Sequence, residues 1–287
     1  MKAIYKREVR AYFKGLIGPV FIALFLAAAG VYTAYLNLVN RIPSFELSLY
    51  NMSIVFLIAI PLLTMRSFAQ ERRQNTDKLL YSSPVRVSGM VAGKYLAMLT
   101  VFAAALGICC LYPLILSLYG EVPFLLTYSY IFIFFLMGAA FIAIGMFLST
   151  LTSNQFIAAA ISFCALLFFY MLEGISSIIS STAFASLMAF SIMALLLALI
   201  LWYMTKNPVA AGIAFAVLEA GLLVAYFLKP TLFEGAIQTF LSGISLFSRS
   251  TVVLNGIFDL GSVVCYLSVI ALFLFLSVQS VEKRRWS

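Results

Sequence analysis

The sequence predicts an all-α integral membrane protein, a bundle of about eight transmembrane helices preceded by an amphipathic helix. Of its 287 residues, 64% are hydrophobic and only 10% are charged, whereas a soluble domain of this length carries roughly 25% charged residues. Apolar runs of about 20 residues, the length of helix that crosses ~30 Å of hydrocarbon, recur along the whole chain. No segment is long and polar enough to form a separate soluble domain, so we expect a single membrane domain over residues 1–287.

Residues 1–15 predict an amphipathic helix in the membrane interface. Its cations recur at intervals of four, at Lys2, Lys6, Arg10 and Lys14, and its other face carries Tyr5, Val9, Tyr12, Phe13 and Leu16. This separation of basic and apolar faces is typical of interfacial helices. The following apolar run continues to about Leu38, which is too long for the apolar part of a signal peptide. We therefore expect an uncleaved helix that leads into the first span.

Hydropathy places the spans at about 16–38, 47–65, 89–118, 128–149, 155–172, 183–204, 208–228 and 260–280. The sixth and seventh are separated only by the turn TKNP, in which Lys206 indicates a polar turn and Pro208 suits a first helical position. The alternative is six spans plus this additional hairpin.

The basic residues predict the orientation. With the N-terminus inside, fifteen of the eighteen Lys and Arg residues fall on inner segments, and only Arg41, Lys229 and Arg249 fall outside. Basic residues are enriched in cytoplasmic loops, so we expect both termini to be cytoplasmic in a bacterial-type plasma membrane. The net charge of +8 is then an orientation signal and does not indicate nucleic-acid binding.

An enzyme active site is not expected. Histidine is absent, the four cysteines lie within predicted spans, and no pair of carboxylates lies inside a span, so neither a metal site nor acid–base catalysis has the side chains it needs. Residues 87–96, VSGMVAGKYL, differ from a phosphate-binding loop, because three residues separate the glycines and Tyr95 follows Lys94. We expect no bound cofactor, a helix start capped by Ser88, and close packing at Gly89 and Gly93.

The segment from Thr64 to Val85, TMRSFAQERRQNTDKLLYSSPV, concentrates charge between two apolar runs. We expect residues 66–87 to form a cytoplasmic loop whose charges are hydrated. Within it, NTDKLLYSS predicts a short helix with Thr76 or Asp77 at its start and Pro84 beyond its end. Such a helix is not stable alone in water. It is therefore either part of an ordinary basic inner loop or a surface that leans on the membrane or on a partner.

The loop resembles the cytoplasmic loop of ABC-2 type exporter permeases, in the branch related to gliding-motility and copper-site-maturation transporters. The matching residues are Pro61, Leu63 to Ala69, Glu71 to Arg73, Thr76, Leu79, Leu80, Ser83 to Val85 and Gly93 to Tyr95. Two weaker islands are STLTSNQ at 149–155, and NGIFDLGSVVCYLS at 255–268 with VEKRRW at 281–286. Asn75 and Lys78 stand where many relatives carry Gly and Glu, and the usual count in that family is six spans.

The resemblance implies a permease subunit of an ATP-driven exporter, which forms the translocation pathway and couples to a separate ABC ATPase subunit. ATP and Mg²⁺ would bind to that partner. The permease would pair with itself or with a related permease. The implied coupling residues are Arg66, Glu71, Arg72, Arg73, Thr76, Asp77, Lys78, Leu79 and Leu80.

Two other functions are open at the level of the sequence. One is a secondary transporter or channel, but such proteins usually carry several ionisable groups near the midplane, and Glu219 is the clear intramembrane charge here. The other is a non-transporting anchor or sensor subunit. Gly212, Ala216 and Glu219 share a helix face, which indicates close helix packing around a carboxylate that faces the protein interior. Glu219 is either a packing residue or part of a substrate path, and the sequence does not indicate the substrate.

Overall fold

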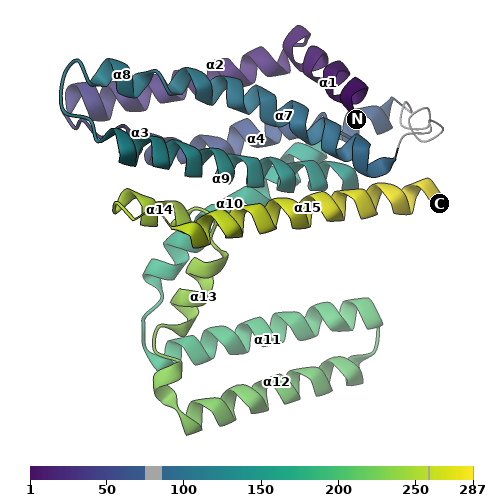
Figure 1. Ribbon diagram of the computed structural model, residues 1–287. Coiled ribbons are helices and arrows are strands. Elements are labelled where there is room, and N and C mark those ends of the chain that lie inside the picture. The colour runs from purple at the N-terminus through teal and green to yellow at the C-terminus, as the bar shows by residue number, and fades with distance from the viewer. Residues whose placement is uncertain (75–85, 258, 287) are drawn as a thin grey trace. The chain divides into compact units, whose positions relative to one another are not determined.

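The computed structural model describes residues 1–74, 86–257 and 259–286, and every regular element within these ranges is a helix (Figure 1). The chain divides into two compact units. Unit 1 comprises residues 1–168 and 246–287, and unit 2 comprises residues 169–245.

Unit 1 begins with α1 (Lys2–Lys14), then α2 (Ile17–Thr33), which continues as the π-helical segment η1 (Ala34–Val39). The next span combines α3 (Phe45–Met52), the 3₁₀ turn η2 (Ser53–Val55) and α4 (Phe56–Thr64), followed by the short α5 (Ala69–Arg73). After residues 75–85 come α7 (Val87–Cys109), α8 (Tyr112–Leu116), α9 (Phe124–Leu151) and the first part of α10 (Gln155–Ile178). The unit closes with α14 (Ser248–Leu254) and α15 (Leu260–Trp286).

The core of unit 1 forms around α9, the span with the largest buried share. Phe25 of α2, Phe56 of α4, Phe102 of α7 and Phe134 of α9 meet there, and the rings of Phe56 and Phe134 stack with centroids 4.7 Å apart. A Cβ at Gly138 would lie 2.5 Å from the Phe102 ring, so this glycine allows the ring to reach α9. Offset and edge-to-face ring pairs of this kind each add about 0.5–1.5 kcal/mol beyond the burial of their area.

Within the described ranges, six helical segments are long and apolar enough to cross a membrane, at 17–39, 45–73, 87–116, 124–151, 155–176 and 260–284. A further pair of apolar helices, at 212–228 and 230–244, is bent by 113° at the break between them. If this pair is one span, the count becomes seven. The polytopic helical membrane protein is therefore confirmed, and the count agrees with six spans plus an additional hairpin. The predicted count of about eight includes both helices of this hairpin, residues 183–204 and 208–228, as two further spans.

Unit 2 contains the additional hairpin, formed by α11 (Ala183–Thr205) and α12 (Pro208–Leu228) (Figure 1). Lys206 makes the turn in a left-handed conformation, and Pro208 is the first residue of α12, as the sequence predicts. The 3₁₀ turn η3 (Pro230–Leu232) and the amphipathic α13 (Ala236–Ile244) follow. The amide of Gln238 donates to the carbonyl of Ile179 at 2.7 Å, which ties α13 to the segment before α11.

The predicted N-terminal helix is present, but it has a buried face that the sequence analysis did not identify. Ile4 and Tyr12 are buried against the rest of unit 1, whereas Phe13 and Leu16 are exposed. Gly93 of α7 makes the contact close, because a Cβ there would lie 3.3 Å from Ile4 Cγ2. The close packing predicted for Gly93 is confirmed. At Gly89 no described residue lies within 4 Å of a Cβ built there, so the structure shows no close packing at that glycine.

Candidate functional site

The candidate site lies where α5 follows the end of α4, at the end of unit 1 that also carries α1 and the last turns of α15 (Figure 1). The first amide groups of a helix have no partner within the helix. Here the hydroxyl of Ser149, on α9, accepts from the backbone N–H of Phe68 at 3.3 Å and of Ala69 at 3.2 Å. Thr64 packs against Gly145 of α9, where a Cβ would lie 2.5 Å from Thr64 Oγ1. The start of α5 is thus fixed to α9.

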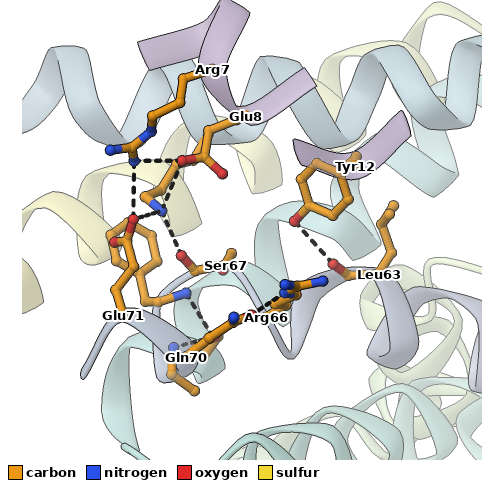
Figure 2. Close-up of polar contacts among 12 residues, drawn as sticks. Arg7, Glu8, Tyr12, Leu63, Arg66, Ser67, Gln70 and Glu71 are labelled. Atoms are coloured by element: carbon orange, nitrogen blue, oxygen red, sulfur yellow. Dashed lines mark hydrogen bonds and ion pairs between the residues drawn. The ribbon is translucent and has the colours of Figure 1, made fainter. Parts of the chain in front are cut away.

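Four charged side chains from three helices form a cluster beside α5, which we call the α1–α5–α7 cluster: Arg7, Glu8, Glu71 and Lys94 (Figure 2). Lys94 Nζ lies 2.8 Å from Glu71 Oε1 and 3.6 Å from Glu8 Oε1. Arg7 Nη2 lies 2.6 Å from Glu8 Oε1 and 3.1 Å from Glu71 Oε1. Two cations and two carboxylates make the cluster neutral in total.

Lys94 is the buried centre of the cluster. Its side chain is only 2% exposed, and its ammonium also donates to the carbonyl of Ser67 at 2.7 Å and lies 5.0 Å from the centre of the Phe68 ring. An ammonium has three N–H donors, and Ser67, Glu71 and Glu8 provide oxygen atoms around it. A buried cation is tolerated only when it is paired and hydrogen-bonded. Lys94 therefore holds α7, the turn before α5, and α5 itself in one arrangement.

The helix α1 supplies two side chains of the cluster, and it is also bonded to the end of α4. Partial burial lowers the pKa of Arg7, but hydrogen bonding and charge from Glu8 and Glu71 outweigh it, so the pKa of this guanidinium is raised overall. Tyr12 donates its hydroxyl to the carbonyl of Leu63 at 3.2 Å (Figure 2). Burial raises the Tyr12 pKa, so the hydroxyl keeps its proton and remains a donor at neutral pH. The helix is thereby joined to the ends of both α4 and α5.

The coupling residues implied by the resemblance lie in several different environments. Arg66 donates from Nε to Gln70 Oε1, Glu71 belongs to the cluster, and Arg73 is exposed. Arg72 is 9% exposed, and its guanidinium donates to the carbonyl of Thr152 at 3.5 Å. The expectation that the charges of this loop are hydrated is therefore wrong for Glu71 and Arg72. Thr76, Asp77, Lys78, Leu79 and Leu80 lie outside the described residues.

The structure gives the motif Gly93–Lys94–Tyr95 a role in packing. Gly93 admits α1, Lys94 centres the cluster, and Tyr95 donates its hydroxyl to the carbonyl of Ala139 at 3.1 Å. The cap predicted at Ser88 is wrong, because Arg86 precedes the first helical residue and no side chain caps this start. Sequence analysis did not identify the roles of Glu8 and Lys94. A lone lysine within an apolar span and a lone acid in a basic helix were the signals that could have revealed them.

The other two islands of resemblance also make contacts in unit 1. Thr150 donates its hydroxyl to Ser280 at 2.9 Å, and Arg284 donates to the carbonyl of Leu151 at 2.9 Å. These bonds attach the end of α15 to the end of α9, next to the α5 start. Asp259 caps α15 by accepting from the backbone N–H of Gly261 and of Ser262. The hydrogen bond from the Ser262 hydroxyl, followed by these backbone bonds, lowers the Asp259 pKa.

Glu219 lies in unit 2 and is half-buried. Its Oε1 accepts a hydrogen bond from the hydroxyl of Ser191 on α11 at 2.8 Å. The carboxylate therefore faces the neighbouring helix of the hairpin, as expected. The close packing predicted along its face is not seen among the described residues, because none of them lies within 4 Å of a Cβ built on Gly212 and Ala216 is exposed. Within the described ranges, no three His, Cys, Asp or Glu side chains are grouped as a metal site would require.

The fold is that of a polytopic helical membrane protein, in which a buried ion-pair cluster joins the N-terminal helix α1 to α5 and α7. Residues 15–207 match the family described as ABC-2 family transporter protein, about two-thirds of the chain. The protein belongs to this family and is a multi-pass ABC transporter permease. The match does not extend to the gliding-motility and copper-site-maturation branch in particular. No curated protein matches the chain.

Proposed function

We propose that this permease forms the translocation pathway of an ATP-driven exporter and couples to a separate ABC ATPase through the surface formed by α5 and the loop that follows it. The observation that carries this proposal is the Lys94–Glu71 ion pair at 2.8 Å, in a chain of the ABC-2 transporter family. A loop that only linked two spans would not need a buried cation, here Lys94, to hold its first helix, α5, in place.

The contacts of α5 supply a mechanical route from this surface into the membrane helices. Lys94 connects α5 and the turn before it to α7, and Ser149 connects the same turn to α9. A displacement of α5 by a partner would therefore move α7 and α9 together, because breaking either connection leaves buried polar groups unsatisfied. Rigid-body shifts of packed helices are an established form of conformational transition in proteins.

The remaining parts of the proposal follow from the family and from the distribution of charge. ATP and Mg²⁺ would bind to the ATPase, and the permease would act as a pair, either with a second copy or with a related chain. Fifteen of eighteen basic residues fall on one side when the α5 side is cytoplasmic, which supports cytoplasmic termini in a bacterial-type plasma membrane.

Site-specific photo-crosslinking tests the assignment. A photoreactive amino acid at Arg73, which is exposed beside the cluster, should capture an ABC ATPase in membranes of the source cells, identified by mass spectrometry. The matched control is the same group at Leu118, which is 80% exposed in a connection at the opposite end of unit 1. Capture of an ATPase from both positions equally, or from neither, would contradict the proposed surface.

A further inference from the structure

A cavity of about 410 Å³ lies at the end of unit 1 opposite α5, between the connection that follows η1 and the connection that follows α8. Its walls are formed by Asn37, Leu38, Arg41, Pro43, Leu116 and Tyr119. The volume is within the range of ligand sites, about 300–1,000 Å³. Both connections join membrane spans, so the cavity lies at the level of the lipid headgroups. The α1–α5–α7 cluster is at the other end and makes no use of it.

Among the described residues that line this cavity, Arg41 is the one that carries a charge. It is exposed, and it forms no ion pair with the described part of the chain. Its backbone is left-handed, with φ of 55°, a conformation that is uncommon for residues other than glycine. A guanidinium has five N–H donors in a planar arrangement that suits phosphate oxygens. The cavity therefore presents a cation that forms no ion pair with the described residues.

The conformation around Arg41 is fixed by buried hydrogen bonds. Asn37 is 6% exposed, donates from Nδ2 to the carbonyl of Ile42 at 2.7 Å and accepts from the hydroxyl of Ser48 at 2.6 Å. The N–H of Ile42 donates to the carbonyl of Leu36 at 3.2 Å. Arg41 is thus held between a buried amide and the end of a π-helical turn, and such turns are frequent at functional sites. The position of the cation is determined by the fold.

The rim of the cavity is apolar. Leu38, in the wall, is 55% exposed, and Val39 and Leu118, which follow and precede wall residues in the sequence, are 71% and 80% exposed. Tyr119 is also exposed, and tyrosine is enriched at the interface between hydrocarbon and water. A soluble anion would make no use of this apolar surface, whereas acyl chains would cover it. A zwitterionic headgroup carries its own cation beside the phosphate and so gains less from Arg41.

From this geometry we propose that the cavity binds an anionic phospholipid, with its phosphate on Arg41 and its acyl chains along the exposed side chains of Leu38, Val39 and Leu118. The inference does not depend on ATP coupling. It assigns a structural lipid to the connection between the first two spans, where it would stabilise the π-helical end of the first span.

Fluorescence quenching by brominated lipids tests the proposal in the full chain reconstituted in phosphatidylcholine vesicles. The reporter is Leu118→Trp in a Trp202→Phe, Trp286→Phe background. Brominated phosphatidylglycerol should bind about three to ten times more tightly than brominated phosphatidylcholine, the size of one charge-assisted contact at a partly exposed site. The ratio should fall to about one in Arg41→Gln and also in Arg41→Gly, which suits the left-handed backbone and so keeps the fold. Lys229→Gln, the matched loss of an exposed cation elsewhere, should retain the preference.

Three outcomes would overturn the proposal. The first is equal quenching by the two lipids in the reporter protein, and the second is an undiminished preference in both Arg41 variants. The third is loss of the preference when inorganic phosphate is added at ionic strength matched with chloride, because the cavity would then take a soluble anion and not a lipid.

Discussion

Lys94 Nζ on α7 lies 2.8 Å from Oε1 of Glu71 on α5, although the two residues lie on opposite sides of the loop in the sequence. Only 2% of the lysine side chain and 17% of the glutamate side chain are exposed. The ion pair joins α5, which precedes the loop, to α7, which follows it. The position of α5 therefore depends on that of α7.

We expect Glu71→Gln to destabilise the protein markedly, because it leaves Lys94 buried without its nearest carboxylate. Removing one partner of a buried pair costs ~3–5 kcal/mol, and the lower end of this range is expected because Glu8 remains 3.6 Å away. The measurement is the thermal unfolding midpoint in detergent, followed by a thiol dye that reports exposure of the buried Cys109.

The control for this experiment is Arg7→Gln in the same cluster. Arg7 has a side chain 52% exposed, so its loss should cost no more than ~1 kcal/mol. A double replacement, Lys94→Met with Glu71→Leu, should be less destabilising than Glu71→Gln alone, since no buried charge is left unpaired. Equal losses in Glu71→Gln and Arg7→Gln would refute the buried role of the pair.

Gly93 and Gly89 provide a matched test of the α1 attachment. Gly93→Leu should displace α1, because even a Cβ at this position lies 3.3 Å from Ile4 Cγ2, and overpacking typically costs ~1–3 kcal/mol. Gly89→Leu places the same side chain one turn away, where no described residue lies within 4 Å of a Cβ, and it should be neutral or slightly stabilising, since leucine favours the helix. The readout is the unfolding midpoint together with trypsin cleavage within residues 2–14. Similar behaviour of the two variants would show that α1 does not pack on α7 as described.

Cysteine labelling tests the orientation and the additional hairpin. Single cysteines at Ser44 and Glu173 in a cysteine-free background should react with an impermeant thiol reagent added outside the cell, and one at Lys206 should not. Lys206 lies in the turn between α11 and α12, so it should be labelled only after the membrane is opened. External labelling at 206 would show that this hairpin does not cross the membrane.

The hydrogen bond between Ser191 and Glu219 leads to a prediction about the carboxylate of unit 2. Glu219→Gln keeps a carbonyl oxygen that can accept from Ser191, so assembly should be normal, whereas Glu219→Leu should weaken the α11–α12 pair by about 0.6 kcal/mol, an average for such bonds in membranes. Yield and unfolding midpoint measure the packing role. Normal transport by Glu219→Gln would then exclude a role for the charge in substrate passage.

The sequence predicted the elements whose signals are local. Hydropathy located the six long spans of the described ranges, and the cation spacing located α1. The sequence did not predict that Glu8 and Tyr12 face the protein. A helical pattern identifies an apolar face, but it does not identify the neighbour that covers this face. Lys94 was identified only by its place in a motif, since pairing it with Glu71 requires knowledge of how α5 folds back. The cavity at Arg41 depends on the backbone conformation of one residue, which composition and periodicity do not determine.

The most direct test of the proposed coupling surface is the amount of ABC ATPase that co-purifies with the permease from membranes of the source cells. Arg73 is exposed, and Leu79 is expected from the resemblance to enter an apolar groove of the partner. A double variant, Arg73→Glu with Leu79→Asp, should reach the membrane at the normal level. It should lose at least about tenfold in co-purified ATPase, since a charge-assisted contact and a buried leucine are each worth ~1.5–3 kcal/mol. Lys206→Glu should leave co-purification unchanged. Normal ATPase recovery and normal transport in the double variant would contradict the proposal that this surface couples the permease to its ATPase.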